Sequence, residues 1–177
     1  EYSISASTHS DGELTVSVYR FMEYHKKNFK VRVKRHGDDG QGLKDAFKGA
    51  KTIRYEANPY WSNNAINTCV VVKIVQYCKH VRRLQVVSDD ECIDMKQVLF
   101  ALAHNATLKR FFMNNTRDYG LIEMLSQNTA LTHLNLSLKT ASDMIALTRG
   151  FRKNVTITTL CIGFSTYTEE IIDLLAE

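Results

Sequence analysis

The sequence predicts an α/β fold in which short parallel strands alternate with helices along an array of similar units. Two observations predict it. A short phrase of Asn and apolar residues recurs along the chain, and each recurrence is followed or preceded by apolar residues at helical spacing. One such unit cannot bury its apolar face alone, so neighbouring units must stack into a solenoid. We therefore expect short parallel strands on a concave face and helices on a convex face.

The composition is that of one ordinary folded domain. The chain has 177 residues, of which 44% are hydrophobic and 24% charged, and its formal net charge is +4. This length is sufficient for a core, and eight Gly with one Pro exclude a collagen-like chain. No apolar run approaches the roughly 20 residues of a membrane helix, so we expect no membrane span. Because the chain begins at Glu1 without a signal peptide, we expect it to be part of a longer protein.

The recurring phrase predicts five strands. In its clearest copies an Asn stands three residues before the first of three apolar residues, which occupy positions 1, 4 and 6 of the phrase. The copies span residues 105–113, 128–136 and 154–162, with a fourth at 78–86, where Cys78 replaces the Asn, and a weaker fifth at 50–55. The fourth positions are Ile53, Leu84, Phe111, Leu134 and Leu160. We expect each of them to point into the core.

Apolar residues at three- and four-residue steps predict a helix in each interval. The apolar residues at this spacing lie within residues 66–77, 95–102, 121–125, 144–151 and 171–175. Asp94 and the acidic residues before it suit the start of the second helix, and Ser142 and Asp143 are capping candidates for the fourth. The Asn after three helices is expected to end the helix in the left-handed conformation. This structural role is favoured over glycosylation for the N-x-S/T sequons at Asn105 and Asn154.

Residues 1–49 differ from the array of residues 50–177. Apolar residues alternate with polar ones at 14–18 and 29–33, which predicts two strands. We expect this region to be an atypical N-terminal cap or a divergent repeat. Residues 20–54 hold eleven Lys and Arg against four Asp and Glu, a net charge of +7. Within them Lys30, Arg32 and Lys34 form a basic patch that suits RNA or another anionic surface.

The phrase resembles the leucine-rich repeats of the ribonuclease-inhibitor type, as found in NLR-type receptors and tropomodulin-like proteins. The resemblance covers about residues 50–177. It implies a leucine-rich-repeat solenoid and a role in an adaptor, receptor or scaffold protein. The chain departs from the family where a ladder Asn is expected three residues after the sixth position. Those places are occupied by Asp89, Thr116, Lys139 and Ser165.

The sequence carries no motif for catalysis. It has no phosphate loop, no G-x-S-x-G and no H-E-x-x-H, and its Cys and His residues lack the spacing of a zinc site. We therefore expect no enzymatic activity, no cofactor and no bound metal. Four cysteines without a disulfide pattern favour the cytoplasm. The four sequons, at Asn105, Asn114, Asn135 and Asn154, leave a secreted protein as the alternative.

The expected function is protein binding on the concave strand surface. Residues that flank the inward apolar positions should point outward there, in two columns. These columns are Thr52, Arg83, Arg110, His133 and Thr159, and Arg54, Gln85, Phe112, Asn135 and Cys161. The predicted protein-binding residues are Arg54, Arg83, Gln85, Arg110, Phe112, Asn114, His133 and Asn135. An exposed Phe112 beside Arg110 is typical of interface centres, although Phe112 could instead pack against a neighbouring repeat. The alternative function is RNA or anionic-surface binding through residues 20–54.

Overall fold

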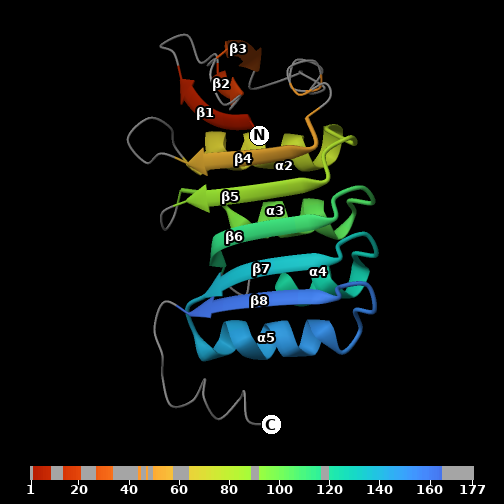
Figure 1. Ribbon diagram of the computed structural model, residues 1–177. Helices are drawn as coiled ribbons and strands as arrows, with labels where there is room; N and C mark the ends of the chain where they lie inside the picture. Colours follow the sequence, from red (N-terminus) through yellow and green to blue (C-terminus); the bar gives the residue numbers. More distant parts are fainter. Residues whose placement is uncertain are drawn as a thin grey trace.

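The computed structural model describes residues 2–8, 14–20, 27–33, 44, 47, 50–57, 64–88, 92–116 and 120–164. Their strands form one sheet in the order β3-β2-β1-β4-β5-β6-β7-β8 (Figure 1). The strands are β1 (Tyr2–Thr8), β2 (Leu14–Arg20), β3 (Lys27–Val33), β4 (Thr52–Ala57), β5 (Arg83–Ser88), β6 (Arg110–Thr116), β7 (His133–Leu138) and β8 (Thr159–Phe164). The helices are α2 (Asn64–Tyr77), α3 (Met95–Ala103), α4 (Leu121–Gln127) and α5 (Ala141–Phe151).

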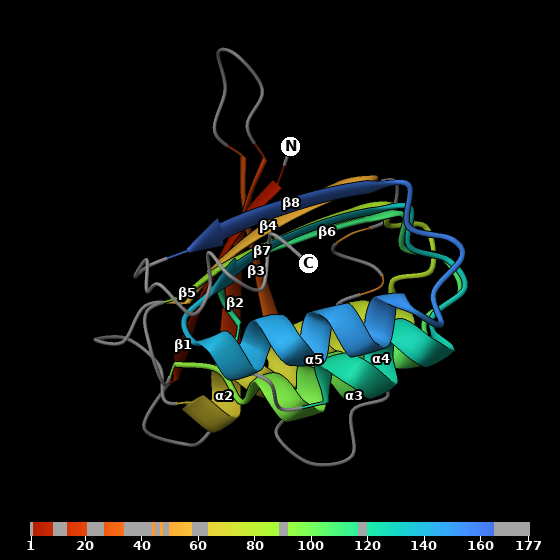
Figure 2. The same ribbon diagram turned by 90° about the horizontal axis from the view of Figure 1, so that it is seen from below.

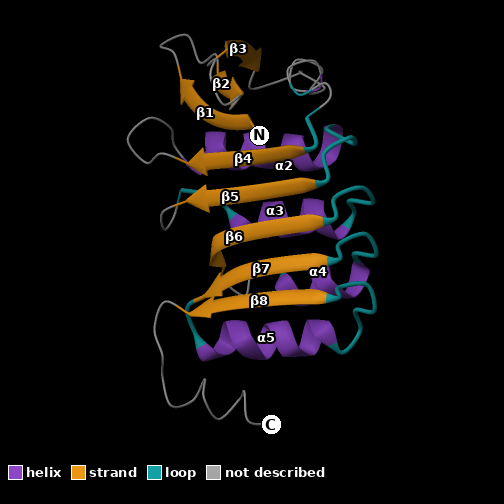
Figure 3. Cartoon of the chain, in the orientation of Figure 1, coloured by secondary structure: helices purple, strands orange, loops and turns teal. Residues whose placement is uncertain are grey.

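Strands β4 to β8 are parallel and alternate with the four helices (Figure 3). Their pairing matches the spacing of the sequence phrase. The fourth positions Ile53, Leu84, Phe111, Leu134 and Leu160 are successive Cα partners across the sheet. The predicted α/β class, the five strands and the first four helices are therefore confirmed, whereas the fifth helix, predicted at 171–175, lies outside the described residues.

All four helices cover the same face of the sheet (Figure 2). The residues of β5 and β7 alternate between buried and more exposed, as the two-residue period of a strand requires. The buried residues belong to the core shared with the helices, so the alternate residues face the opposite side. The opposite side of β4–β8 carries no helix in the described part of the chain.

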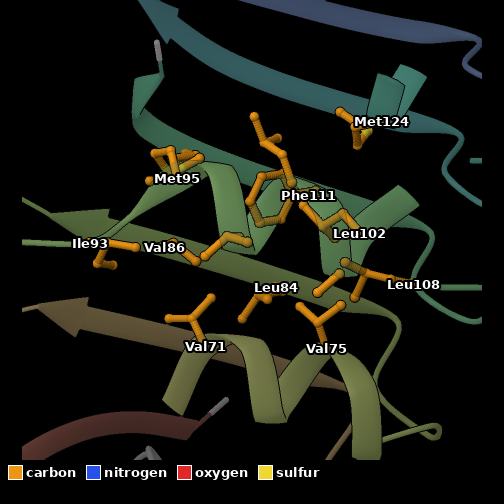
Figure 4. Close-up of a cluster of buried hydrophobic side chains, with 14 of the residues drawn as sticks. Val71, Val75, Leu84, Val86, Ile93, Met95, Leu102, Leu108, Phe111 and Met124 are labelled. Atoms are coloured by element: carbon orange, nitrogen blue, oxygen red, sulfur yellow. The ribbon is translucent and has the colours of Figure 1, made fainter. Parts of the chain in front are cut away.

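The core lies between the sheet and the helices. Figure 4 shows Val71 and Val75 of α2 next to Leu84 of β5, with Leu102 of α3 and Phe111 of β6 beyond them. All five of these side chains are buried. Burying an aliphatic or aromatic side chain of this size stabilises the fold by about 1.5–3 kcal/mol. The core therefore supplies the rigid support on which the residues of the opposite face are displayed.

Strands β1, β2 and β3 form an antiparallel meander at the edge of the parallel strands. Strand β1 pairs with β2 and β2 with β3 in antiparallel fashion, while β1 runs parallel to β4. The strands predicted at 14–18 and 29–33 are found within β2 and β3, but β1 was not predicted. A divergent repeat at residues 29–33 would place that strand beside β4, and the sheet order instead places β1 there.

Helices α3 and α5 begin with side-chain caps, although not always the predicted ones. Asp94 is the N-cap of α3 and accepts a hydrogen bond from the amide of Lys96. At α5 the N-cap is Thr140, so the assignment of Ser142 as a cap was wrong. Asp143 completes a capping box with Thr140 because each side chain accepts a hydrogen bond from the other residue's amide.

At Asn128 the phrase does not use a left-handed backbone. Asn128 has φ −74° and ψ 121°, which is extended, so the predicted left-handed conformation was wrong there. Its side chain makes the turn instead. Asn128 Oδ1 accepts hydrogen bonds from the amides of Ala130 and Leu131, and Nδ2 donates to the carbonyls of Leu102 and Asn105 in the preceding unit.

Asn105 and Asn154 repeat this arrangement. In each case Oδ1 accepts from the amides two and three residues later. Nδ2 of Asn105 donates to Val75 O at 2.6 Å, and Nδ2 of Asn154 donates to Leu125 O at 2.8 Å. Each carbonyl lies in the last turn of the helix one unit earlier, α2 for Asn105 and α4 for Asn154. Backbone acceptors there lack a partner within the helix. In these three copies the Asn amide therefore both shapes the turn and ties one unit to the next.

Candidate functional site on the open face of the sheet

The open face is the side of β4–β8 that lies opposite the helices. Its two predicted columns are confirmed by the strand pairing. Thr52, Arg83, Arg110, His133 and Thr159 are successive Cα partners, and so are Arg54, Gln85, Phe112, Asn135 and Cys161. The strands therefore display two parallel rows of side chains at a spacing of about 4.8 Å.

A hollow lies in the middle of the open face. Its volume is ≈ 200 Å³. The lining residues come from four strands and are Arg83, Arg110, Phe111, Phe112, His133, Leu134, Asn135, Thr159 and Cys161. Phe111 and Leu134 are buried members of the core, whereas the remaining residues belong to the two columns. Five predicted binding residues, namely Arg83, Arg110, Phe112, His133 and Asn135, are brought together here.

The charge around the hollow is one-sided. Arg83 and Arg110 are exposed, and neither guanidinium has a hydrogen-bond or ion-pair partner within the described part of the chain. The only carboxylate in strands β4–β8 belongs to Glu56, of β4, which does not line the hollow. The hollow therefore presents positive charge that no neighbouring acidic group on these strands neutralises.

His133 adds a hydrogen-bonding group of known orientation. Its Nδ1 lies 2.9 Å from the hydroxyl of Thr132, and that hydroxyl donates its proton to the carbonyl of Lys109. A hydroxyl has one proton to donate, so Nδ1 of His133 must be the donor in their contact. The contact with Thr132 thus occupies Nδ1 and leaves Nε2 as the other polar atom of the ring.

Phe112 is half-buried and lines the hollow. It thus takes an intermediate position between the two expectations for this residue, full exposure and packing within the array. A partly exposed aromatic ring next to Arg110 offers apolar contact area close to a cation. Such pairs are enriched at the centres of protein interfaces.

Three predicted binding residues lie outside the hollow. Arg54 is on β4 and Gln85 on β5, both half-buried in the second column. Asn114 Oδ1 accepts a hydrogen bond from the amide of Ser88 at 2.8 Å, so its side chain joins β5 to β6. Conversely, Thr159 and Cys161 line the hollow but were not predicted as binding residues. Their positions in the two columns were the signal that could have identified them.

Two residues of the predicted basic patch lie on strand β3. Lys30 and Arg32 lie on β3, paired with Ser17 and Thr15 of β2. Lys34 lies outside the described residues. The strand that carries Lys30 and Arg32 is at the edge of the sheet farthest from β8.

A second hollow, of ≈ 210 Å³, lies on the helix side. Val75, Lys79, Phe100, His104 and Asn105 contribute to its wall. Two of its polar groups are already engaged, because Asn105 Nδ2 donates to Val75 O and His104 Nδ1 contacts Phe100 O at 2.9 Å. The described residues that line it include Lys79 but no arginine, whereas Arg83 and Arg110 line the hollow on the open face.

The described residues contain no group of three His, Cys, Asp or Glu placed to hold a metal ion. None of the described helices has the length and apolar character needed to span a bilayer. Comparison of the chain with protein-family models, with curated proteins and with solved structures finds no match.

Proposed function

We propose that this chain is a non-catalytic protein-binding module, built as a leucine-rich-repeat solenoid, which binds its partner on the open face of the sheet. The observation that carries the proposal is the hollow on that face, where Arg83, Arg110 and Phe112 converge. Arg and aromatic side chains in such a cluster supply much of the binding free energy in protein interfaces. An adaptor, receptor or scaffold protein would use the module in this way.

The solenoid part of the proposal is supported by the recurrence of contacts. Strand pairing joins equivalent residues of successive phrases. Each Asn side chain also donates to the equivalent carbonyl near the end of the helix in the preceding unit. Contacts limited to neighbouring units are what a solenoid requires.

A cytoplasmic location is proposed on two observations. All four cysteines, at positions 69, 78, 92 and 161, are free thiols. In addition, the side-chain amides of Asn105 and Asn154 donate hydrogen bonds to backbone carbonyls of the preceding unit. A glycan on either Nδ2 would disturb those bonds, so the sequons at these residues have a structural explanation.

Affinity capture from cell lysate with a matched pair of variants tests the protein-binding function. Phe112→Ala removes the aromatic ring of the hollow, and Phe100→Ala removes a ring that is 57% exposed on helix α3. We expect a bound protein that survives nuclease treatment and is lost in Phe112→Ala but retained in Phe100→Ala. Loss of about 2 kcal/mol of binding free energy is typical for such a residue.

The opposite outcome would identify the alternative function. In that outcome both Phe variants recover nucleic acid, and binding is lost at moderate salt. Binding is also lost in the triple variant Lys30→Glu, Arg32→Glu, Lys34→Glu. These results would assign binding to residues 20–54. Phosphate contacts weaken steeply with salt because binding releases condensed counterions.

A further inference from the structure

We infer that the hollow on the open face takes an acidic peptide segment of the partner, with a carboxylate seated between Arg83 and Arg110. This inference rests on the proposed protein-binding function and adds the chemistry of the bound segment. It is carried by the charge of the hollow, by its size and by the hydrogen-bonding groups that line it.

The charge of the hollow calls for an anion. Arg83 and Arg110 are Cα partners on adjacent strands, both exposed, and both line the same hollow. Adjacent strands lie about 4.8 Å apart, so a carboxylate placed between the two side chains is within reach of both guanidinium groups. Guanidinium and carboxylate groups match in geometry and form charge-assisted hydrogen bonds that are about twice as strong as neutral ones.

The size of the hollow suits a side chain better than a cofactor. The hollow has a volume of ≈ 200 Å³. Pockets for drug-sized ligands and cofactors are larger, at about 300–1,000 Å³. The hollow therefore has room for one or two side chains of a segment that lies across the strands.

The remaining lining groups favour a peptide over a bare phosphate. His133 contributes its ring Nε2, and Asn135 supplies an amide with two donors and an acceptor. A peptide backbone provides an N–H donor for the Asn135 amide oxygen beside the carboxylate, whereas a fully ionised phosphate has none. Phe112 supplies apolar contact for a neighbouring side chain.

Selection of a random twelve-residue peptide library on the immobilised 177-residue chain tests the inference. We expect the selected peptides to be enriched in Asp and Glu. Binding of a selected peptide should weaken at least about tenfold in Arg83→Glu and in Arg110→Glu. The controls are Arg149→Glu, in the last turn of α5, and Arg152→Glu, at its C-cap. Both residues are exposed and undergo the same charge change, and both variants should bind the peptide as the wild type does.

The position of the peptide is checked at Cys161. This exposed thiol lines the hollow, whereas Cys78 and Cys92 are buried. A bound peptide should slow alkylation of Cys161 by N-ethylmaleimide in the wild type, and should give no protection in Arg110→Glu.

Two outcomes would overturn the inference. One is selection of peptides without enriched carboxylates, and the other is recovery of no peptide at all. Either result leaves the proposed function standing if a protein is still captured by the wild type and lost in Phe112→Ala. Failure of that capture, with peptides nevertheless selected, would instead count against the proposed function.

Discussion

Strands β7 and β8 carry the same apolar phrase but differ in burial. Leu134 of β7 is 1% exposed, whereas its Cα partner in β8, Leu160, is 40% exposed. Strand β7 lies between β6 and β8, and β8 is the last strand of the described sheet. The same phrase is therefore buried where another unit packs against it and more exposed where no further strand follows in the described sheet. This dependence on the neighbouring unit is expected of stacked units.

Leucine truncation at the two partner positions tests this difference most strongly. Leu134→Ala removes a buried side chain and leaves a cavity, so we expect a loss of about 4 kcal/mol in the free energy of unfolding. Leu160→Ala removes a side chain that is already partly hydrated, and the expected loss is about 1 kcal/mol. Urea denaturation of the two variants and the wild type measures both values. Equal losses would show that β8 is as fully packed as β7.

The asparagines provide a second matched pair. Asn128 and Asn154 each make two hydrogen bonds to amides of their own turn and two to carbonyls of the preceding unit. Asn128 is buried and Asn154 half-buried. Asn128→Ala leaves buried amides and carbonyls unsatisfied, and we expect it to cost about 3 kcal/mol.

Water can replace part of the lost bonding at Asn154. We therefore expect Asn154→Ala to cost about 1 kcal/mol in the same urea experiment. A loss at Asn154 as large as that at Asn128 would contradict the assignment of burial as the source of the difference.

Much of the parallel array is predictable from the sequence because each unit carries the same spacing of apolar residues. The spacing of the phrase predicts that Ile53, Leu84, Phe111, Leu134 and Leu160 lie in register, and the strand pairing confirms it. Both columns of the open face follow from that register, because strand residues alternate between the two faces.

The remainder depends on contacts that no local pattern contains. Alternation in Tyr2, Ile4 and Ala6 is too weak to predict β1, whose place beside β4 is a long-range pairing. Likewise, the sequence does not show how closely α4 and α5 pack at Gly150. A Cβ atom added there would lie only 2.6 Å from Leu125 Cδ1 of α4. The hollow is also not predictable, because its depth depends on the rotamers of side chains from four strands.

The unit that begins at Cys78 differs from the later ones in the residue at the Asn position. Cys78 is buried, and the amide of Val81 donates to its backbone carbonyl at 3.0 Å. In the later units the equivalent amides, of Leu108 and Leu131, donate instead to an Asn side chain. Burial raises the pKa of the Cys78 thiol to about 12 from its usual 9.0. This position is thus titratable in one unit and not in the units with Asn.

The raised pKa predicts a loss of stability in alkali. The folded state holds the thiol proton more tightly than the unfolded state does, so the stabilisation is complete below pH 9 and declines as the pH rises toward 12. Between pH 8 and pH 10 we expect the free energy of unfolding to fall by about 1.4 kcal/mol from this group. Tyr55, whose pKa burial also raises, adds a decline only above its usual value of 10.0. Cys78→Ala should remove the decline between pH 8 and pH 10 in urea titrations, and a decline unchanged in that variant would mean that another group is responsible.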